Sequence, residues 1–380
     1  MSTASTPDLI VVGSGIIGLA TAWRAWHRGM SVQVIDAAAR PTGASIQNFG
    51  HACFTAQADA IQTVASLSRQ GWVDAAAEVG LWAATPGTIL PATTEIELEV
   101  LREFASHRGE REVLLLNAED TCARLGVSGM SSGIIGGAHL PRDMRVNPRE
   151  AAPALAEWLA SHGVTFTWNT SVFSVSDGCV HTSRGEFRAA EVVVCPGHHL
   201  STIFPDLAND QGVRTCVLTM ASIDRPDHIS ADLAMLTGTS MARYDGLAAM
   251  PSATALRAEL ADREPELVDC VANLMVTGMP DPRGGLFIGD SHSYSDSPEP
   301  FIEESTASLL LDRASRLLGI DRPVVRQRWQ GRYADSSSTN LVLHRPDDRT
   351  TVAVVTSGIG MTLSFGIASL IINHDDAPTF

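Results

Sequence analysis

The 380-residue chain contains no lysine, and all 27 of its basic residues are arginine. This absence excludes a pyridoxal phosphate Schiff base, a P-loop lysine and a lysine general base. With 43 acidic residues the formal net charge is −16, which disfavours nucleic acid or an anionic membrane as a partner. A small anionic substrate would therefore need a local basic pocket.

Cysteine is scarce and dispersed. No C-x-x-C pair and no metal-ligand spacing occurs among the six cysteines, and the histidines form no H-x-x-x-H pair. We therefore predict no dithiol reductase site and no metal. Dispersed cysteines are typical of a reducing compartment, and we expect a cytoplasmic protein.

Long hydrophobic runs are also absent. Residues 1–7 are short and polar, and the apolar stretch that follows is interrupted by glycines, so we predict neither a signal peptide nor a membrane span. The length suits two structural units.

A strand–glycine–helix pattern opens the chain. An apolar run over residues 9–12 is followed by Gly13, Gly15 and Gly18 at G-x-G-x-x-G spacing and then by an alanine-rich stretch. The three glycines suit a tight turn, close approach of a pyrophosphate and close helix packing. The phosphates would lie at the helix N-terminus, beside Ile16 and Ile17.

A second apolar run, residues 31–35, ends on Asp36. A carboxylate at this distance accepts hydrogen bonds from ribose hydroxyls, which argues against NADP. The complete pattern predicts dinucleotide binding, but it does not choose between FAD and NAD.

The same pattern recurs near the C-terminus, where an apolar run over 351–355 precedes Gly358 and Gly360 and a helix over 362–372. Junctions at both ends of the chain predict a discontinuous nucleotide domain with a catalytic domain inserted. Between them, periodicity predicts helices near 59–84, 95–107, 117–125, 147–159 and 303–318. It predicts strands near 164–168, 170–175, 179–182, 186–189, 191–195, 212–229 and 286–288, the last followed by a polar loop.

Taken in order, these motifs resemble the D-amino-acid oxidase type of FAD-dependent oxidoreductase, a family that includes glycine oxidase and sarcosine oxidase. The resemblance spans nearly the whole chain and includes the segment from Gly43 to Gly50, the strand that ends at Gly197, and Gly331-Arg332. It implies an α/β fold in which a discontinuous Rossmann-like FAD-binding domain carries an inserted α+β substrate domain on a mostly antiparallel sheet. The implied FAD-binding parts are residues 1–58, 146–211 and 326–380, and the substrate parts are 59–145 and 212–325.

The resemblance also implies how FAD is held. Gln47 stands near the position where covalent members carry a histidine, and no cysteine follows Cys270, so we expect FAD to be bound non-covalently. The implied cofactor contacts are Gly13, Gly15, Ile16, Ile17, Gly18, Asp36, Arg40, Ser45, Gln47, Asn48, Val172, Gly197, Arg332, Gly358, Gly360, Met361 and Thr362.

The implied reaction is oxidation of a small primary or secondary amine by hydride transfer to flavin N5, followed by hydrolysis of the imine. The segments Asn48-Phe-Gly-His51 and Gly289-Asp-Ser-His-Ser-Tyr294 are similar to a bacterial subgroup associated with phosphonate catabolism. An aminoalkylphosphonate, such as 2-aminoethylphosphonate or its N-methyl form, is therefore the expected substrate. The alternative is a glycine, sarcosine or D-amino acid oxidase.

Four residues are predicted to act on this substrate. Arg332 would bind its anionic group, because a guanidinium matches carboxylate and phosphonate oxygens, with Arg243 and Arg145 as further candidates. His292 would neutralise a phosphonate or take the ammonium proton. Tyr294 and His51 would line the same pocket.

Three other functions remain open. Ile288-Gly289-Asp290 superficially resembles the FAD motif of aromatic monooxygenases, although a polar loop rather than a helix is expected after it. A single Rossmann domain would suit an NAD-linked dehydrogenase, and an assembly subunit could hold FAD without catalysis. The sequence leaves open the choice between oxidase and dehydrogenase, the stereospecificity and the oligomeric state.

Overall fold

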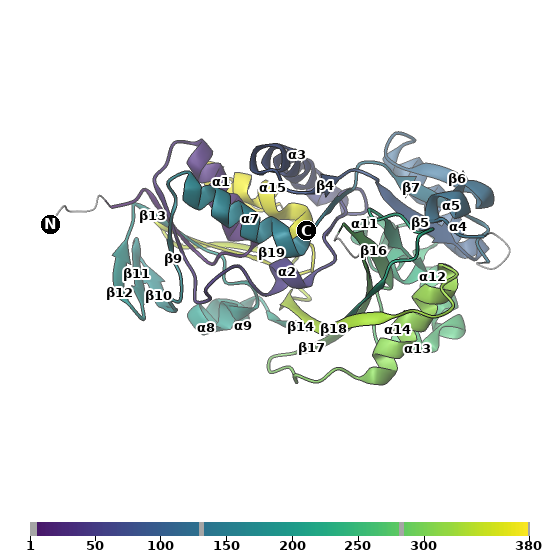
Figure 1. Cartoon of the computed structure of the whole chain (residues 1–380). Helices are drawn as coiled ribbons and strands as arrows, with labels where there is room; N and C mark the ends of the chain where they lie inside the picture. The colour runs from purple at the N-terminus through teal and green to yellow at the C-terminus, as the bar shows by residue number, and fades with distance from the viewer. Residues whose placement is uncertain (1–5, 129–132, 281–284, 379–380) are drawn as a thin grey trace.

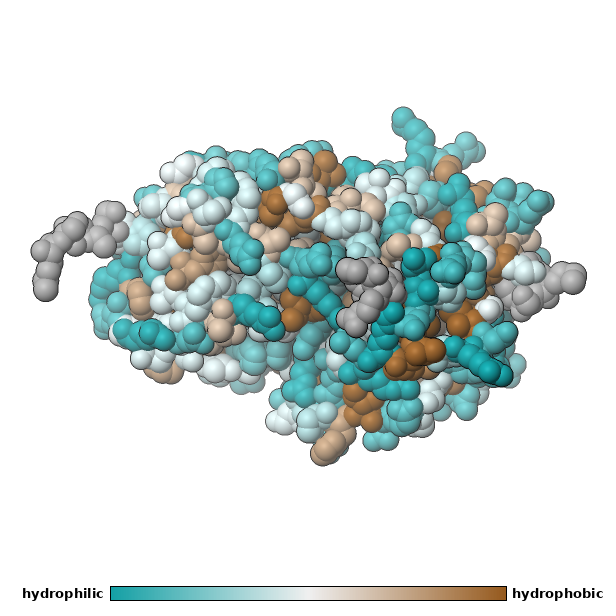
Figure 2. Space-filling model, in the orientation of Figure 1, coloured by the Kyte–Doolittle hydropathy of each residue, from teal (hydrophilic) through white to brown (hydrophobic). Residues whose placement is uncertain are grey.

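The computed structural model describes residues 6–128, 133–280 and 285–378. Most of the polar N-terminal segment, residues 1–5, lies outside the described part. Two large sheets organise the chain, one beneath the helices α1, α3, α7 and α15 and the other extending toward α14 and α4 (Figure 1). In Figure 2, apolar residues are scattered among polar ones on the face shown. Isolated exposed apolar residues are ordinary on a protein surface.

The first sheet has six strands. Its order is β19 (Leu341–Asp347), β20 (Thr350–Val355), β13 (Glu191–Val194), β1 (Leu9–Val12), β2 (Val32–Ile35) and β9 (Thr165–Thr167). Every neighbouring pair is parallel except β19–β20. The helices grouped on this side are α1 (Ile16–His27), α3 (Gln62–Val79), α7 (Pro148–Ser161) and α15 (Gly360–Asn373).

The second sheet has eight strands and is mostly antiparallel; only the β15–β5 pair is parallel. Its order is β18 (Val325–Asp335), β14 (Arg214–Asp224), β17 (Gly285–Ser295), β16 (Met275–Met279), β15 (Ala234–Leu236), β5 (Thr88–Ala92), β7 (Gly136–Leu140) and β6 (Leu114–Asn117). These two sheets confirm the predicted α/β fold with a Rossmann-like sheet and a mostly antiparallel one.

Smaller elements complete the chain. Two three-stranded sheets consist of β10 (Val172–Ser176), β11 (Cys179–Thr182) and β12 (Gly185–Arg188), and of β3 (His51–Ala52), β8 (Met144–Val146) and β4 (Ala83–Ala84). The remaining helices are α2 (Ala44–Gln47), α4 (Glu95–Arg108), α5 (Ala118–Leu125), α8 (Leu200–Ile203), α9 (Pro205–Asp210), α10 (Gly238–Met241), α11 (Asp245–Ala248), α12 (Ala253–Arg263), α13 (Pro265–Asp269) and α14 (Glu304–Leu317), with 3-10 turns η1 (Asp59–Ile61) and η2 (Gly197–His199).

Capping residues define several of the helix ends. The side chains of Asn117 and Asn147 act as N-caps, because they accept hydrogen bonds from the first turns of α5 and α7. The helix predicted to reach residue 84 is too long, because α3 ends at Gly80 in a left-handed conformation with φ 76°. The strand predicted over 212–229 is shorter and covers Arg214–Asp224.

The predicted division into five domain segments stays a prediction. Strands from residues 9–35, 165–194 and 341–355 share the six-stranded sheet. The helix α3 begins after the predicted boundary at residue 59, yet it packs on α15 and contributes to the same core as α1 and β1.

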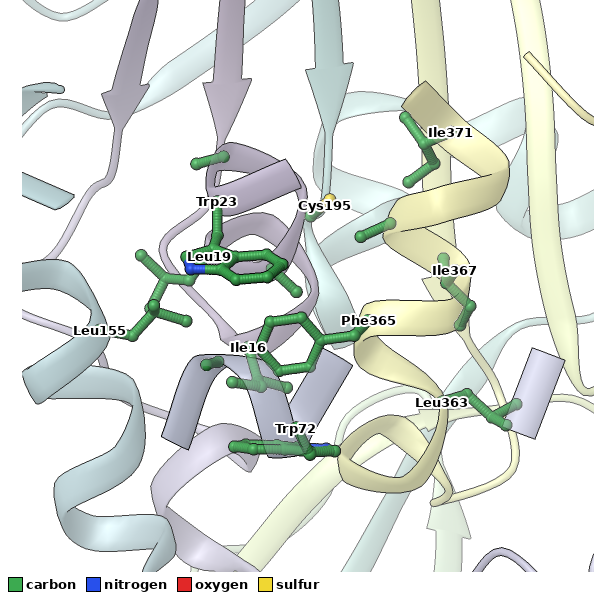
Figure 3. Packing of buried hydrophobic residues seen from close by; sticks show 14 of the residues in the cluster. Ile16, Leu19, Trp23, Trp72, Leu155, Cys195, Leu363, Phe365, Ile367 and Ile371 are labelled. Atoms are coloured by element: carbon green, nitrogen blue, oxygen red, sulfur yellow. The ribbon is translucent and has the colours of Figure 1, made fainter. Parts of the chain in front are cut away.

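Aromatic packing joins α1, α3 and α15 (Figure 3). Phe365 on α15 lies between Trp23 on α1 and Trp72 on α3, with ring centroids 5.4 Å and 5.0 Å away in edge-to-face geometry. The indole N–H of Trp72 donates to the Met361 carbonyl at 2.8 Å. A β-carbon at Gly71 would collide with Phe365, so only glycine permits this close approach. The packing fixes where α15 begins.

We predict that Trp72→Ala lowers the free energy of unfolding by about 3–5 kcal/mol, because it opens a cavity in a fully buried core. Trp72→Phe keeps the ring contact and loses the hydrogen bond, so it should cost about 1–2 kcal/mol. Chemical denaturation followed by circular dichroism measures both. Equal losses for the two variants would contradict this ranking.

Candidate functional site

A cavity of about 350 Å³ lies between the two glycine junctions and the eight-stranded sheet. One side consists of the N-terminal ends of α1 and α15 and of the α2 segment. The other side consists of residues from β14, β17 and β18 and the turn that precedes α11. Segments from both ends of the sequence therefore meet at one site.

The first glycine junction forms a cradle. Gly15 is the N-cap of α1, and the hydroxyl of Ser45 accepts a hydrogen bond from the Ile16 backbone N–H at 2.8 Å. A β-carbon on Gly15 would lie 3.2 Å from that hydroxyl and would take space from the cavity. The start of α15 supplies Gly360 and Met361 to the same cavity. Two helix N-termini facing one space suit an anionic group.

Gly13 and Asp36 do not border the cavity, but they stabilise the turn between β1 and α1. Gly13 has φ 101°, and a β-carbon there would collide with the Cys195 carbonyl. One Asp36 oxygen accepts hydrogen bonds from the Ser14 N–H at 2.6 Å and the Ser14 hydroxyl at 2.7 Å, and the other accepts from the Ala38 N–H at 2.7 Å. Both oxygens thus have partners within the chain, and the ribose role of Asp36 stays a prediction.

Most of the predicted cofactor contacts border the cavity. They are Gly15, Ile16, Ile17, Gly18, Ser45, Gln47, Asn48, Gly197, Arg332, Gly358, Gly360 and Met361. Among the described residues, five further predicted contacts do not border it: Gly13, Asp36, Arg40, Val172 and Thr362. Arg40 is exposed and Val172 begins β10, whereas the Thr362 hydroxyl accepts a hydrogen bond from the Cys53 backbone N–H at 3.2 Å.

His51 borders the cavity, and its ring is positioned by Thr88 and Asp143, which do not border it. Its Nε2 lies 2.6 Å from the Thr88 hydroxyl, which donates to Asp143 at 2.7 Å. Burial, and then the nearby Arg145, lower the pKa of His51 to about 3. We therefore regard His51 as neutral in the protein. Its predicted catalytic role stays a prediction.

Arg145 has a structural role in this arrangement. The side chain is fully buried, and its guanidinium donates to the carbonyl oxygens of Phe49, Leu233 and Gly278. Among the described residues it does not border the cavity. It ties the segment after α2 to the second sheet.

The prediction of a polar loop after residue 288 is wrong. The strand β17 continues to Ser295, because it stays paired with β14 as far as Thr215. Its register shifts between Gly289 and His292, and Asp290 and His292 are buried at the site rather than exposed to solvent. Asp290 and His292 border the cavity. Tyr294 stands behind them, with its hydroxyl 3.4 Å from an Arg243 nitrogen. An FAD motif at the start of a helix, as in monooxygenases, is therefore not present at residues 288–290.

Arg332 and Tyr333 lie on opposite faces of β18. Tyr333 on β18 and Tyr294 on β17 both pair with Cys216 of the β14 strand between them, so Tyr333 shares the sheet face of Tyr294 and His292. The Arg332 guanidinium instead donates to the Gln330 side chain at 3.0 Å and the Glu299 carbonyl at 3.4 Å. The geometry favours Arg243 over Arg332 as the residue that binds a substrate anion.

Burial and neighbouring charges shift the pKa values of three groups at this end of the cavity, Asp290, His292 and Arg243. Burial raises the pKa of Asp290 to about 7, although Arg243 opposes the shift. Burial, and then the charge of Arg243, lower the pKa of His292 to about 3. Burial alone would lower the pKa of Arg243, and its contacts with Tyr294, Tyr333 and Asp290 raise it above its usual value. The site therefore holds a permanent cation beside a carboxyl group that titrates near neutrality.

Sequence reasoning missed Asp290, Tyr333 and Asn273, all of which border the cavity. The sequence places Asp290 in the segment similar to the phosphonate-associated subgroup and in the monooxygenase-like motif, but it assigns the residue no role in the site. The alternation of residues 290, 292 and 294 was the available signal, but these polar residues looked like a loop. Asn273 lies in a turn after α13 and carries no recognisable signal.

Residues 8–373 match the sequence model of a protein family, the FAD-dependent oxidoreductases of the D-amino-acid oxidase (DAO) type. The chain belongs to this family. Its cofactor is FAD, and the site fits that assignment, since two helix N-termini border the same cavity and favour an anionic group such as a pyrophosphate. The residues that would hold FAD are those of the two glycine junctions and the α2 segment. When bound, FAD supplies the acceptor for the electrons of the oxidised substrate.

Solved structures of other enzymes share the fold. Glycine oxidase from Geobacillus kaustophilus is 19% identical with a TM-score of 0.76, covering 99% of this chain and 97% of that one. L-proline dehydrogenase from P. horikoshii is 16% identical with a TM-score of 0.78, covering 98% and 95%. L-α-glycerophosphate oxidase from Mycoplasma pneumoniae, solved with FAD bound, is 15% identical with a TM-score of 0.75, covering 99% and 97%. No protein with a curated function matches this chain by sequence.

These findings make the protein an FAD-dependent oxidoreductase. They identify neither its substrate nor its electron acceptor. In the part of the chain that the structure describes, no helix is both long and apolar enough to cross a membrane.

We predict that Gly15→Val weakens FAD binding by at least about tenfold, because its side chain would enter the space bordered by Ser45 and α1. Thermal unfolding of the cofactor-free protein should change little, since Gly15 has extended backbone geometry with φ −67°. Fluorescence titration with FAD measures the affinity. Undiminished binding would show that the cofactor avoids this cradle.

Proposed function

We propose that the protein oxidises a small amine that carries an anionic group, with an aminoalkylphosphonate as the preferred substrate. The observation that carries this proposal is that Arg243, Asp290 and His292 all border the sheet end of the cavity, where the charge of Arg243 acts on the other two. A guanidinium that remains charged suits a phosphonate or carboxylate. The nearby carboxyl and imidazole groups suit an amine.

The chemistry asked of the protein is modest. The site must hold the amine so that its α-carbon faces the flavin, keep the nitrogen deprotonated, and exclude competing water. The anion at Arg243 would fix one end of the substrate. The N-terminus of α15 would favour negative charge on the reduced cofactor.

Several features support a phosphonate over a simple amino acid. The segments at residues 48–51 and 289–294 are similar to the phosphonate-associated subgroup, and both border the cavity. Tyr333 borders the cavity near Arg243 and would add a hydroxyl donor for a group with three oxygens, while Tyr294 holds Arg243 from behind. Glycine, sarcosine or a D-amino acid is the alternative, supported by the fold shared with glycine oxidase.

Two further proposals complete the account. FAD would be bound non-covalently, since Gln47 borders the cavity where covalent members carry a histidine. All six cysteines are free thiols, which supports a cytoplasmic protein.

The substrate class is tested by anaerobic reduction of the bound flavin. 2-Aminoethylphosphonate, its N-methyl form, glycine and sarcosine are mixed separately with the FAD-loaded protein, and the loss of oxidised-flavin absorbance is followed. We expect rapid reduction by one of the phosphonates and at least about tenfold slower reduction by glycine and sarcosine. Faster reduction by glycine or sarcosine would replace the phosphonate with an amino acid, and no reduction by any amine would contradict amine oxidation.

We also predict that Arg243→Met weakens binding of the substrate anion by about 30-fold or more, because a buried charge partner is lost. The dissociation constant comes from the substrate dependence of flavin reduction. Arg188→Met on the exposed strand β12 is the matched control and should leave it unchanged. If Arg332→Met weakens substrate binding more than Arg243→Met does, Arg332 rather than Arg243 binds the anion.

A further inference from the structure

Asp290 and His292 point two hydrogen-bond acceptors at each other. Nδ1 of His292 lies 2.9 Å from the Val271 carbonyl, and a carbonyl only accepts, so Nδ1 carries the proton. Nε2 of the neutral ring therefore presents a lone pair. It lies 3.8 Å from Oδ2 of Asp290, which is too far for a good direct hydrogen bond.

The second oxygen of Asp290 is also without a donor. Oδ1 is buried and accepts no hydrogen bond from the described residues, while the whole residue is only 4% exposed. A buried acceptor of this kind costs free energy unless a ligand satisfies it. Three acceptor positions, Oδ1 and Oδ2 of Asp290 and Nε2 of His292, thus converge at one point of the cavity wall. Among the described residues Oδ1 has no hydrogen-bond donor, although the nearby Asn273 side chain acts to lower the pKa of the carboxyl group.

We propose that Asp290 and His292 form the site for the ammonium group of the substrate, and that Asp290 removes one of its protons before oxidation. An alkylammonium carries three N–H donors, which match Oδ1 and Oδ2 of Asp290 and Nε2 of His292. Arg243 borders the same cavity, and its charge acts on both residues, so one small zwitterion would place its anion at Arg243 and its ammonium at the pair. The proposal rests on the proposed function and adds that the substrate is a zwitterion bound in one orientation.

The proton transfer balances within the pair. An N–H bond of the ammonium breaks, an O–H bond forms on the Asp290 carboxylate, and the electron pair stays on nitrogen. The product is a neutral amine, the form from which a hydride can leave, beside a neutral carboxylic acid. His292 keeps its Nδ1 proton and accepts a hydrogen bond from the amine.

The groups around Asp290 decide at which pH this transfer operates. His292 faces it from β17, Cys216 from β14, Tyr333 from β18, and Arg243 and Tyr244 from the turn before α11. Arg243 is the permanent charge in this set. Burial raises the pKa of Asp290 to about 7, so the carboxylate becomes available as the pH rises through neutrality.

The test is the pH dependence of anaerobic flavin reduction at subsaturating 2-aminoethylphosphonate. In the wild type the rate should rise with pH through a pKa near 7. Asp290→Asn should be slower by about 100-fold at pH 7, and its rate should rise about tenfold per pH unit toward the pKa of the free amine, about 10. Asp224→Asn, at the far end of β14, is the matched control. An unchanged rate and pH profile in Asp290→Asn would overturn the proposal.

A second measurement keeps the proposal testable if no amine reduces the flavin. Infrared difference spectra of the substrate-free protein should show a protonated carboxyl group that titrates near pH 7 and is missing in Asp290→Asn. If that group is already ionised at pH 5, Asp290 does not hold a proton as proposed. If the carboxyl group titrates near pH 7 but no amine reduces the flavin, the proposed function is wrong, whereas the assignment of Asp290 as a group that exchanges a proton near neutrality still holds.

Discussion

The close packing of α1, α3 and α15 is the constraint on which the site depends. Phe365 lies between Trp23 and Trp72, and this contact sets the position of two helix N-termini from opposite ends of the chain. Because both termini border one cavity, their backbone dipoles act on the same bound group. A shift of α15 would move the N–H groups at its start away from that group and leave the first junction alone.

The opposite wall of the cavity consists of side chains from the eight-stranded sheet rather than of helix N-termini. A mostly antiparallel sheet presents alternate side chains to each face. Two strands that flank β14 supply the cavity side: β17 carries Asp290 and His292, and β18 carries Tyr333. Burial then adjusts the charge of these groups, with Arg243 as the fixed cation. The cofactor end is thus made mostly of backbone, and the substrate end of side chains.

The sequence predicted the two strand–glycine–helix junctions well because their signals are local. The glycine spacing, the apolar strands and the helix that follows all lie within a few tens of residues, and they specified both junctions and Ser45. The substrate end depends on strand pairing over long distances. Arg332 and Tyr333 are neighbours in sequence but lie on opposite faces of β18, and polar residues on β17 looked like a loop because their burial comes from the partner strands.

In the proposed complex the amine and the anion of the substrate lie at opposite ends of a side-chain cluster, with the amine at Asp290 and His292 and the anion at Arg243. A crystal structure of the FAD-loaded protein with 2-aminoethylphosphonate under anaerobic conditions tests it most directly. The account predicts the amine nitrogen within hydrogen-bond distance of the Asp290 carboxyl and phosphonate oxygens on the Arg243 guanidinium. A phosphonate bound beside Arg332, or an amine turned away from Asp290, would contradict it.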